Sequence, residues 1–155
     1  MSVKPIPEGY TSLTTFLCID GAAEAIDFYV SVFGAKLIER MDGPNGIVAH
    51  AELDFGSGRL QLSDPQESYK LAAPERGEFV THSVALYCPD VDDVVTRAEN
   101  AGATIREPAQ TFVTGDRFAS IIDPFGQRWT VMTRVEDVSA EERDRRMAEW
   151  SSQNV

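Results

Sequence analysis

The sequence repeats one pattern of elements, and this repeat limits the folds open to the chain. In each copy a short apolar segment ends at an aspartate, Asp20 or Asp90, and the spacing of apolar residues predicts an amphipathic helix after it. Both helices are expected to end at a Gly-Ala pair, with Gly34 and Gly102 in the left-handed conformation that closes a helix. The repeat therefore predicts two similar modules of the order β-α-β-β-β.

The module boundaries follow from this repeat. The first module is predicted over residues 10–64 and the second over residues 82–135. Residues 65–81 are the expected linker, which contains two prolines and a glycine. Residues 139–150 open with a Ser-x-x-Glu capping box, which predicts a short C-terminal helix. We therefore expect an α+β protein with a single structural domain, in which two tandem modules share a cavity.

Charge and hydropathy exclude several kinds of partner. The chain has 14 basic and 25 acidic residues, a net charge of -11, and no long run of lysine or arginine. This balance argues against nucleic acid and anionic membrane as partners. No apolar stretch reaches the ~20 residues that span a bilayer, and the first ten residues lack the apolar core of a signal peptide. We expect a cytoplasmic protein with no nucleic-acid or membrane partner.

Polar and apolar residues alternate strictly over residues 49–55, as they do in a strand with one covered face. The hairpin that follows continues the alternation, so the apolar residues are expected to pack on the helices. The polar side chains predicted to share the opposite face, toward the cavity, are those of His50, Glu52, Asp54, Gln61 and Ser63.

This prediction depends on the hairpin turn. If Ser57 and Gly58 form a two-residue turn, Glu52 lies opposite Ser63 and Asp54 lies opposite Gln61. A three-residue turn over 56–58 would instead move the whole polar set to the outer face.

His50 and Glu52 are the candidate catalytic residues. An imidazole two residues from a carboxylate on one strand face can act as a general base with an orienting acid. The same pair can also supply two ligands to a metal. A histidine on a strand is otherwise simply solvated or hydrogen-bonded, and this third interpretation stays open.

Three features of the sequence together resemble one family, the vicinal oxygen chelate superfamily of glyoxalases, bleomycin-resistance proteins and extradiol dioxygenases. They are the paired modules, the segments 25–29 (AIDFY) and 33–35 (FGA), and the hairpin 123–126 (DPFG). The resemblance extends over residues 10–138, and the Asp-Pro-Phe-Gly-x-Arg-Trp hairpin resembles the PhnB-like branch. It implies a glyoxalase-like fold in which curved mixed sheets form a cleft, and a homodimer that completes this cleft.

The resemblance also implies a divalent metal held by four side chains in the metal-dependent members. The positions in this chain that correspond to this quartet are Leu13, Gln61, Ser83 and Thr130. They include no carboxylate, imidazole or thiol, from which tight first-row metal sites are built. We therefore expect no metal at these positions and no cofactor. A divalent metal stays possible if the ligands have moved to His50, Glu52, Gln61 and His82.

Strand parity extends the predicted ligand-binding surface over both modules. The predicted ligand-binding residues are Leu13, Thr15, Gln61, Ser63, Ser83, Tyr87, Arg128 and Thr130. An aromatic and aliphatic wall of this kind suits a planar or apolar ligand, although such a stripe is also typical of ordinary core. Arg128 could bind an anionic group or lie on the surface beside Asp123.

Three functions fit these observations, and we favour the first. It is metal-free binding of a small-molecule ligand, which resembles the drug-sequestering resistance proteins of this superfamily. The second is a metal-dependent glyoxalase-like lyase, isomerase or dioxygenase with a displaced site around His50 and Glu52. The third is metal-free acid-base catalysis by the same pair. The sequence contains no Gly-rich phosphate loop after a strand, no Gly-x-Ser-x-Gly elbow and no Cys-x-x-Cys pair, so nucleophilic catalysis is not supported.

Overall fold

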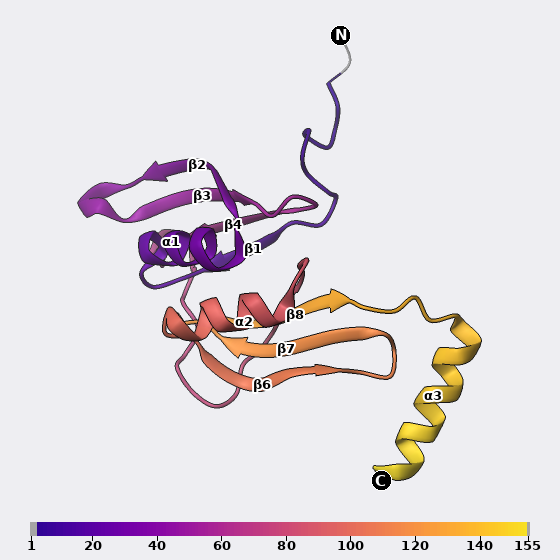
Figure 1. Ribbon diagram of the computed structural model, residues 1–155. Helices are drawn as coiled ribbons and strands as arrows, with labels where there is room; N and C mark the ends of the chain where they lie inside the picture. Colours follow the sequence, from indigo (N-terminus) through magenta and orange to yellow (C-terminus); the bar gives the residue numbers. More distant parts are fainter. Residues whose placement is uncertain (1–2, 155) are drawn as a thin grey trace. The chain divides into compact units, whose positions relative to one another are not determined.

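The computed structural model describes residues 3–154, and it divides the chain into two compact units that meet between Glu78 and Phe79. Each unit contains a four-stranded mixed sheet and one helix that lies against a face of that sheet (Figure 1). The predicted α+β class with two β-α-β-β-β modules is confirmed, and a further helix follows the second module.

The first unit begins with an extended segment and then contains its sheet and helix in the predicted order. Its elements are β1 (Thr15–Cys18), α1 (Ala22–Phe33), β2 (Lys36–Asp42), β3 (Val48–Asp54) and β4 (Arg59–Ser63). Two single-turn 3-10 helices, η1 (Pro44–Gly46) and η2 (Glu67–Tyr69), lie in its loops. The strand order in the sheet is β1-β4-β3-β2, with β1 parallel to β4 and the other pairs antiparallel.

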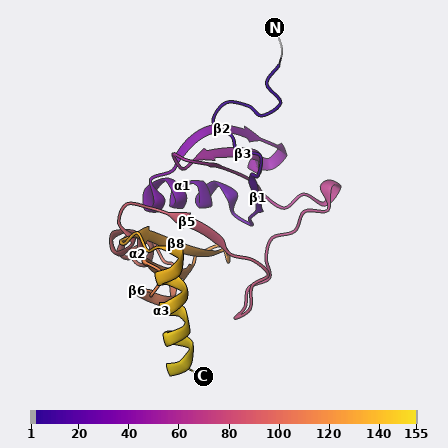
Figure 2. The same cartoon turned by 90° about the vertical axis from the view of Figure 1, so that its right-hand side faces the viewer.

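The second unit repeats this topology. Its elements are β5 (Val84–Tyr87), α2 (Val91–Asn100), β6 (Thr104–Thr111), β7 (Asp116–Ile122), β8 (Arg128–Arg134) and α3 (Ala140–Gln153). The strand order is β5-β8-β7-β6, and β5 is parallel to β8 as β1 is to β4. Figure 2 shows both helices α1 and α2 against their own sheets. The duplication read from the sequence is therefore a duplication of structure.

The core of the first unit lies between α1 and the apolar face of its sheet. The predicted helix stripe is largely correct, because Ala22, Ala25, Ile26 and Tyr29 are buried. The buried sheet residues include Ala51, Leu53, Leu60 and Leu62, each at most 3% exposed. Because α1 covers this face, the polar residues between them in β3 and β4 lie on the opposite, open face of the sheet.

The predicted turn in the β3–β4 hairpin is wrong, although the predicted face is correct. The backbone N–H of Phe55 donates to the carbonyl of Gly58 at 2.9 Å, so the two turn residues are Gly56 and Ser57. Gly56 has φ +95°, a conformation that favours glycine and suits a tight hairpin turn. Glu52 consequently pairs with Gln61 and not with Ser63. The pairing moves by two residues, and a shift of two leaves every side chain on its face.

The two helices begin differently. Asp90 caps α2 as predicted, because its carboxylate accepts a hydrogen bond from the backbone N–H of Asp93 at 3.1 Å. Asp20 does not cap α1: Gly21 holds the cap position with φ +88° and no side-chain cap. A carboxylate from a distant part of the chain takes the place of the missing cap.

That carboxylate belongs to Asp64, the residue directly after β4. Its Oδ1 accepts hydrogen bonds from the backbone N–H groups of Gly21 and Ala22 at 3.1 and 3.0 Å. Its Oδ2 accepts from the backbone N–H of Val48, at the start of β3, at 2.7 Å. One side chain thus joins the start of α1, the start of β3 and the end of β4.

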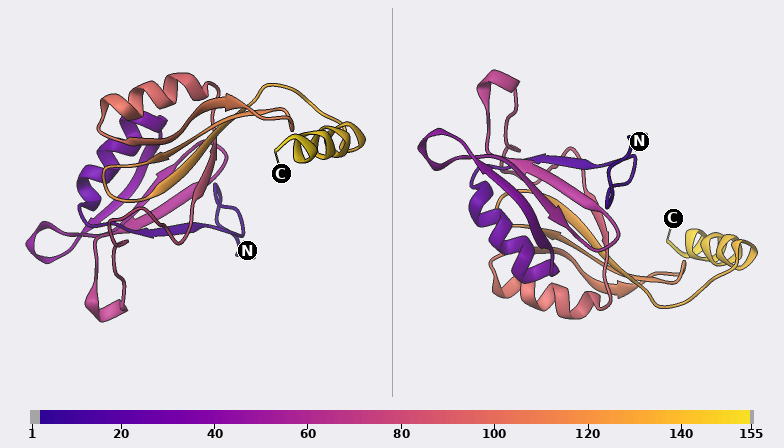
Figure 3. Two further views of the ribbon diagram at one scale, coloured as in Figure 1. Left: turned by 90° about the horizontal axis from the view of Figure 1, so that it is seen from below. Right: turned by 90° about the horizontal axis from the view of Figure 1, so that it is seen from above.

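The C-terminal helix is capped as predicted, with the Ser139 hydroxyl accepting from the Glu142 N–H at 3.2 Å. It extends three residues beyond the predicted end, to Gln153. None of its residues is buried, and the helix projects away from the β5–β8 sheet (Figure 3). Trp150, near the end of this helix, contacts Phe112 edge to face, with 5.4 Å between the ring centroids.

Removing the Asp64 carboxylate tests its role in the fold. We expect Asp64→Ala to lower the free energy of unfolding by about 2–3 kcal/mol, because a helix cap is lost and part-buried N–H groups lose their acceptor. Urea unfolding followed by circular dichroism measures this loss. The matched control is Asp20→Ala, which removes an exposed carboxylate beside the same helix and should change stability by less than about 0.5 kcal/mol. Equal losses in the two variants would contradict the assignment.

Candidate functional site

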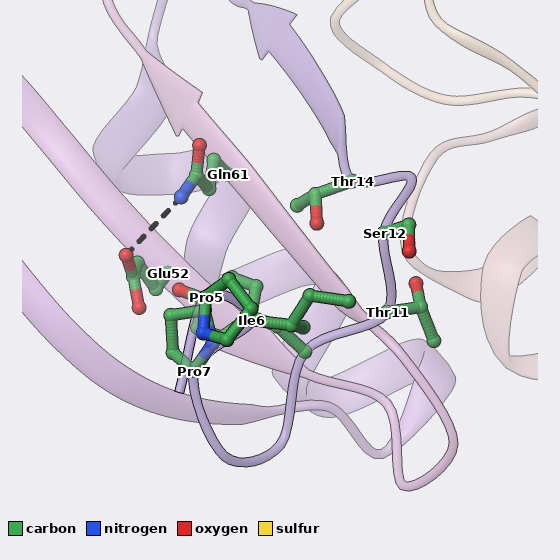
Figure 4. Close-up of a pocket in the computed structure, with 9 residues that line it drawn as sticks. Pro5, Ile6, Pro7, Thr11, Ser12, Thr14, Glu52 and Gln61 are labelled. Carbon is green, nitrogen blue, oxygen red and sulfur yellow. Dashed lines mark hydrogen bonds between the residues drawn. The ribbon is translucent and has the colours of Figure 1, made fainter. Parts of the chain in front are cut away.

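The open face of the first sheet brings three of the predicted site residues together. Nε2 of His50 lies 3.3 Å from Oε1 of Glu52, and Nε2 of Gln61 donates to the same oxygen at 3.2 Å. The register explains this cluster, because Glu52 and Gln61 are direct partners in β3 and β4 and His50 lies two residues away on the same face. Figure 4 shows the contact between Gln61 and Glu52 on the sheet surface.

Two further residues complete this polar cluster, and the sequence analysis missed both. Nη1 of Arg59 lies 3.8 Å from Oε2 of Glu52. The Arg59 guanidinium also stacks on the ring of Tyr10, with 4.6 Å from Cζ to the ring centroid. Strand alternation could have found Arg59, which shares the parity of Gln61. No periodic signal marks Tyr10, because it lies in the irregular segment before β1.

Glu52 remains ionised at neutral pH in this environment. The Tyr10 hydroxyl is the largest influence, and with the hydrogen bonds from His50 and Gln61 it outweighs burial and holds the pKa of Glu52 below its ordinary value. An ionised carboxylate only accepts hydrogen bonds, so Nε2 of His50 is the donor in their contact. A neutral His50 therefore carries its lone pair on Nδ1, which is the atom that can accept a proton.

A cavity lies on each side of the His50–Glu52 pair. The first has a volume of about 400 Å³ and lies between Glu52, Gln61 and the N-terminal segment, as Figure 4 shows. The second has a volume of about 420 Å³, and His50 and Gln66 are its polar lining. The remaining lining of the second cavity is aromatic and aliphatic: Phe16, Met41, Ala49, Tyr69 and Leu71. Both volumes fall in the range of small-molecule sites.

In β1 the side chain of Phe16, and not that of Thr15, lies on this open face. Phe16 pairs with Gln61, and its ring lies 6.1 Å from that of His50. Thr15 pairs with the buried Leu60 and so lies on the other face, which corrects its predicted place. Leu13 precedes β1 and is 87% exposed. The predicted alternation in β1 is therefore one residue out of phase.

Ser63 also differs from its predicted role. It has the parity of Gln61, but its side chain is fully buried. Its hydroxyl donates to the backbone carbonyl of Asp64 at 2.9 Å. The hydroxyl is therefore used inside the structure and does not belong to the accessible part of the polar face.

In the second unit, predicted ligand residues lie on the open face of the β5–β8 sheet. The hydroxyls of Ser83 and Thr130 are 3.0 Å apart, and Tyr87, 58% exposed, donates to Oδ2 of Asp116 at 3.3 Å. Arg128 is on this face as predicted, where its Nε donates to the Ser120 hydroxyl at 2.9 Å. Hydroxyl groups line much of this face, Arg128 lies 3.6 Å from the carboxylate of Glu107, and within the part of the chain that the structure describes the face has no carboxylate–imidazole pair.

His82 has partners of its own in the second unit. Its Nε2 lies 3.0 Å from the amide oxygen of Gln127, and its Nδ1 lies 3.2 Å from the Thr81 hydroxyl. Both ring nitrogens are therefore engaged, and His82 offers neither to a metal without losing a hydrogen bond.

The donor set does not fit a bound metal. Within residues 3–154 no group of three or more histidine, cysteine, aspartate or glutamate side chains could hold an ion. His50 and Glu52 give two donors, and their neighbours Gln61 and Arg59 give an amide and a cation. A tight first-row metal site needs a third strong donor that this cluster lacks.

Comparison with known proteins places the chain in a family. The sequence pattern of the Glyoxalase/Bleomycin resistance protein/Dioxygenase superfamily matches residues 12–131, so the chain belongs to this superfamily. An uncharacterized protein of Mycobacterium bovis is 36% identical over 134 residues, which cover 84% of this chain and 88% of that protein.

Solved structures support the same fold. TioX from Micromonospora is similar with a TM-score of 0.64 and 28% identity, over 80% of this chain and 98% of TioX. The PhnB protein of Bacillus cereus has a TM-score of 0.61 and 21% identity, over 79% of this chain and 99% of that protein. The second likeness concerns the fold alone. No helix among the described residues is long and apolar enough to cross a membrane.

The lowered pKa of Glu52 predicts a pH-dependent contribution to stability. A carboxylate with a lowered folded pKa stabilises the protein above its unfolded pKa of about 4.3, and this contribution is lost as the pH falls through the folded value. We expect Glu52→Gln to be less stable than the unaltered protein at pH 7. The difference should narrow as the pH falls below about 4.3. Urea unfolding at a series of pH values measures it.

Glu39→Gln is the control for this experiment. Glu39 is the exposed partner of Glu52 on the neighbouring strand β2. Its variant therefore removes a carboxylate from the same sheet that does not belong to the polar cluster. We expect its variant to follow the unaltered protein at every pH. A constant gap between Glu52→Gln and the unaltered protein over the whole pH range would refute the linkage.

Proposed function

We propose that this protein binds a small organic molecule on the open face of its first sheet, with Glu52 and His50 as the polar anchors and without a metal. The observation that carries this proposal is the ionised Glu52 carboxylate, held by His50 and Gln61 between two cavities of about 400 and 420 Å³. A few convergent polar groups beside an aromatic and aliphatic wall are typical of a small-molecule site.

Membership of the superfamily is compatible with binding alone, since its description includes resistance proteins beside glyoxalases and dioxygenases. Fold does not decide between these activities, so the decision depends on the site. A metal mechanism needs a ligand set that neither the corresponding positions nor the His50–Glu52 pair provides. Binding needs only the cavities and the polar anchors.

One observation favours a second function, metal-free acid-base catalysis. Glu52 fixes Nε2 of His50 as a donor and leaves Nδ1 as the proton acceptor, and His50 lines the apolar cavity beside Phe16 and Met41. A base oriented by a carboxylate is the arrangement that proton abstraction needs. In this candidate His50 removes a proton from a bound molecule and Glu52 positions the imidazole.

We also infer that the chain is nearest to the PhnB-like branch and forms a homodimer. The branch assignment is supported by the Asp-Pro-Phe-Gly-x-Arg-Trp hairpin over residues 123–129. The dimer is supported by large apolar side chains that the single chain leaves exposed, among them Val135 and Trp150. Sedimentation equilibrium of the untagged protein should give twice the mass of one chain. A single-chain mass at micromolar concentration would contradict the dimer.

Ligand screening tests the proposed function. A ligand at 100 times its dissociation constant adds about 2.7 kcal/mol to the free energy of unfolding, which raises the melting temperature by several degrees. We expect small aromatic and amphipathic compounds to produce such shifts in a chelator-treated sample. His50→Ala and Glu52→Ala should lose them, because these residues anchor the ligand.

The control is Tyr87→Ala, which removes an exposed aromatic side chain from the second unit and should keep the shifts. Shifts that vanish in Tyr87→Ala and persist in Glu52→Ala would move the site to the second sheet and overturn the proposal. The same preparations should be titrated with nickel, zinc, manganese and iron(II). Uptake of one ion per chain that His50→Ala and Glu52→Ala abolish would establish the metal-dependent alternative instead.

A further inference from the structure

The N-terminal segment, residues 3–14, lies beside the polar cluster and forms one wall of the first cavity. Figure 4 shows Pro5, Ile6 and Pro7 on the side of this cavity next to Glu52. Two hydrogen bonds lie within this segment: the Tyr10 N–H donates to the Pro7 carbonyl at 3.2 Å, and the Thr11 hydroxyl donates to the Leu13 carbonyl at 2.6 Å. We call this segment the strap.

Tyr10 is the residue that attaches the strap to the sheet. Its ring lies under the guanidinium of Arg59, and its hydroxyl is the strongest influence on the Glu52 carboxylate. The apolar side chains of the strap, Val3, Ile6 and Leu13, are instead exposed. An attachment through one aromatic side chain is easy to release, because no backbone hydrogen bond to the sheet has to break.

The attachment is also imperfect. The Tyr10 hydroxyl is buried but has no partner among the described residues with the geometry of a regular hydrogen bond. The backbone beside Tyr10 runs close to the same arginine: a Cβ on Gly9, which has φ +83°, would lie 2.5 Å from Nη2 of Arg59. A buried hydroxyl without a good partner is unfavourable, and an untethered molecule could do better.

We propose that the Tyr10 side chain holds the place of the ligand, and that the molecule bound here is a phenol, a planar aromatic compound with a hydroxyl group, which displaces the strap. This inference rests on the proposed function and names its ligand class. The ring of the phenol would stack on Arg59, as the ring of Tyr10 does. Its hydroxyl would donate to Glu52, and its ring would fill the space that the Tyr10 side chain leaves.

The charges of the cluster favour a neutral donor over other ligands. An anion would meet the Glu52 carboxylate and a chain of net charge -11. A cation would meet the Arg59 guanidinium, which lies 3.8 Å from the same carboxylate. A purely apolar ring would cover Glu52 without giving it a donor, and a site built to bond a hydroxyl rejects the analogue that lacks one.

Displacement makes Tyr10 an internal competitor. The apparent affinity of a free phenol is reduced by the fraction of molecules in which the strap is open. Removing the Tyr10 ring should therefore strengthen the binding of a free phenol, whereas removing a residue that only contacts the ligand would weaken it. This opposite sign separates a competitor from an ordinary binding residue.

Calorimetric titration with 4-methylphenol, and with toluene as the analogue without a hydroxyl, tests the proposal. We expect Tyr10→Ala to bind 4-methylphenol at least about tenfold more tightly than the unaltered protein does. Toluene should bind Tyr10→Ala much more weakly than 4-methylphenol does. Adding Glu52→Ala to Tyr10→Ala should remove the difference between the two compounds. Phe79→Ala, which removes an exposed aromatic ring outside the polar cluster, should bind 4-methylphenol as the unaltered protein does.

A second variant releases the strap and keeps the tyrosine. Gly9→Ala strains a position with φ +83° and places a methyl group against Arg59, so it should also strengthen 4-methylphenol binding. If Tyr10→Ala fails to fold, the affinity of Gly9→Ala for 4-methylphenol tests the proposal in its place. Unchanged or weakened affinity for 4-methylphenol in the folded variants, or equal affinity for toluene, overturns the proposal.

The failure of this inference is distinguishable from that of the proposed function. If library compounds stabilise the unaltered protein through His50 and Glu52, while 4-methylphenol binds no better after loss of Tyr10, the phenol assignment falls and small-molecule binding stands. If neither the library nor 4-methylphenol binds to any variant, both fall.

Discussion

The carboxylate of Asp64 is the interaction on which the first unit depends. It accepts three backbone N–H groups, two from the start of α1 and one from Val48 at the start of β3. Asp64 directly follows β4, so these hydrogen bonds fix where β3 begins relative to β4 and α1. The position of Glu52 opposite Gln61 follows from that register. The polar cluster therefore depends on a carboxylate that is not part of it.

The second unit meets the same need with a different side chain. By the internal repeat, Asp64 corresponds to Thr133. Ala22 corresponds to Val91 because these residues begin α1 and α2. The Thr133 hydroxyl accepts from the Val91 N–H at 2.9 Å and donates to the Cys88 carbonyl at 3.0 Å. In both units the strand parallel to the first strand anchors the helix start. The hydroxyl suffices in the second unit because Asp90 caps α2 as well.

The sequence predicted correctly those features that depend on residues close together in the chain. The repeat predicted the element order, and alternation predicted that His50, Glu52 and Gln61 share one face. The sequence pattern could not predict that the acceptor at the start of α1 comes from 43 residues along the chain, because Asp20 beside the helix is the stronger local signal. Nor could it find Tyr10, since a residue in an irregular segment has no period and its place depends on the turn before it.

The two units share a fold and differ in chemistry at matching positions. Arg59 corresponds to Arg128 in the repeat, but Arg59 faces the carboxylate of Glu52, whereas Arg128 donates to the hydroxyl of Ser120 and lies 3.6 Å from the carboxylate of Glu107 on β6. The serine at the position of Glu52 has no charge with which to orient an imidazole. The ionised anchor and its histidine are therefore features of the first unit alone among the described residues. Duplication supplied two equivalent sheet faces, and the residue at one matching strand position, Glu52 in β3 and Ser120 in β7, distinguishes the face that carries the proposed site.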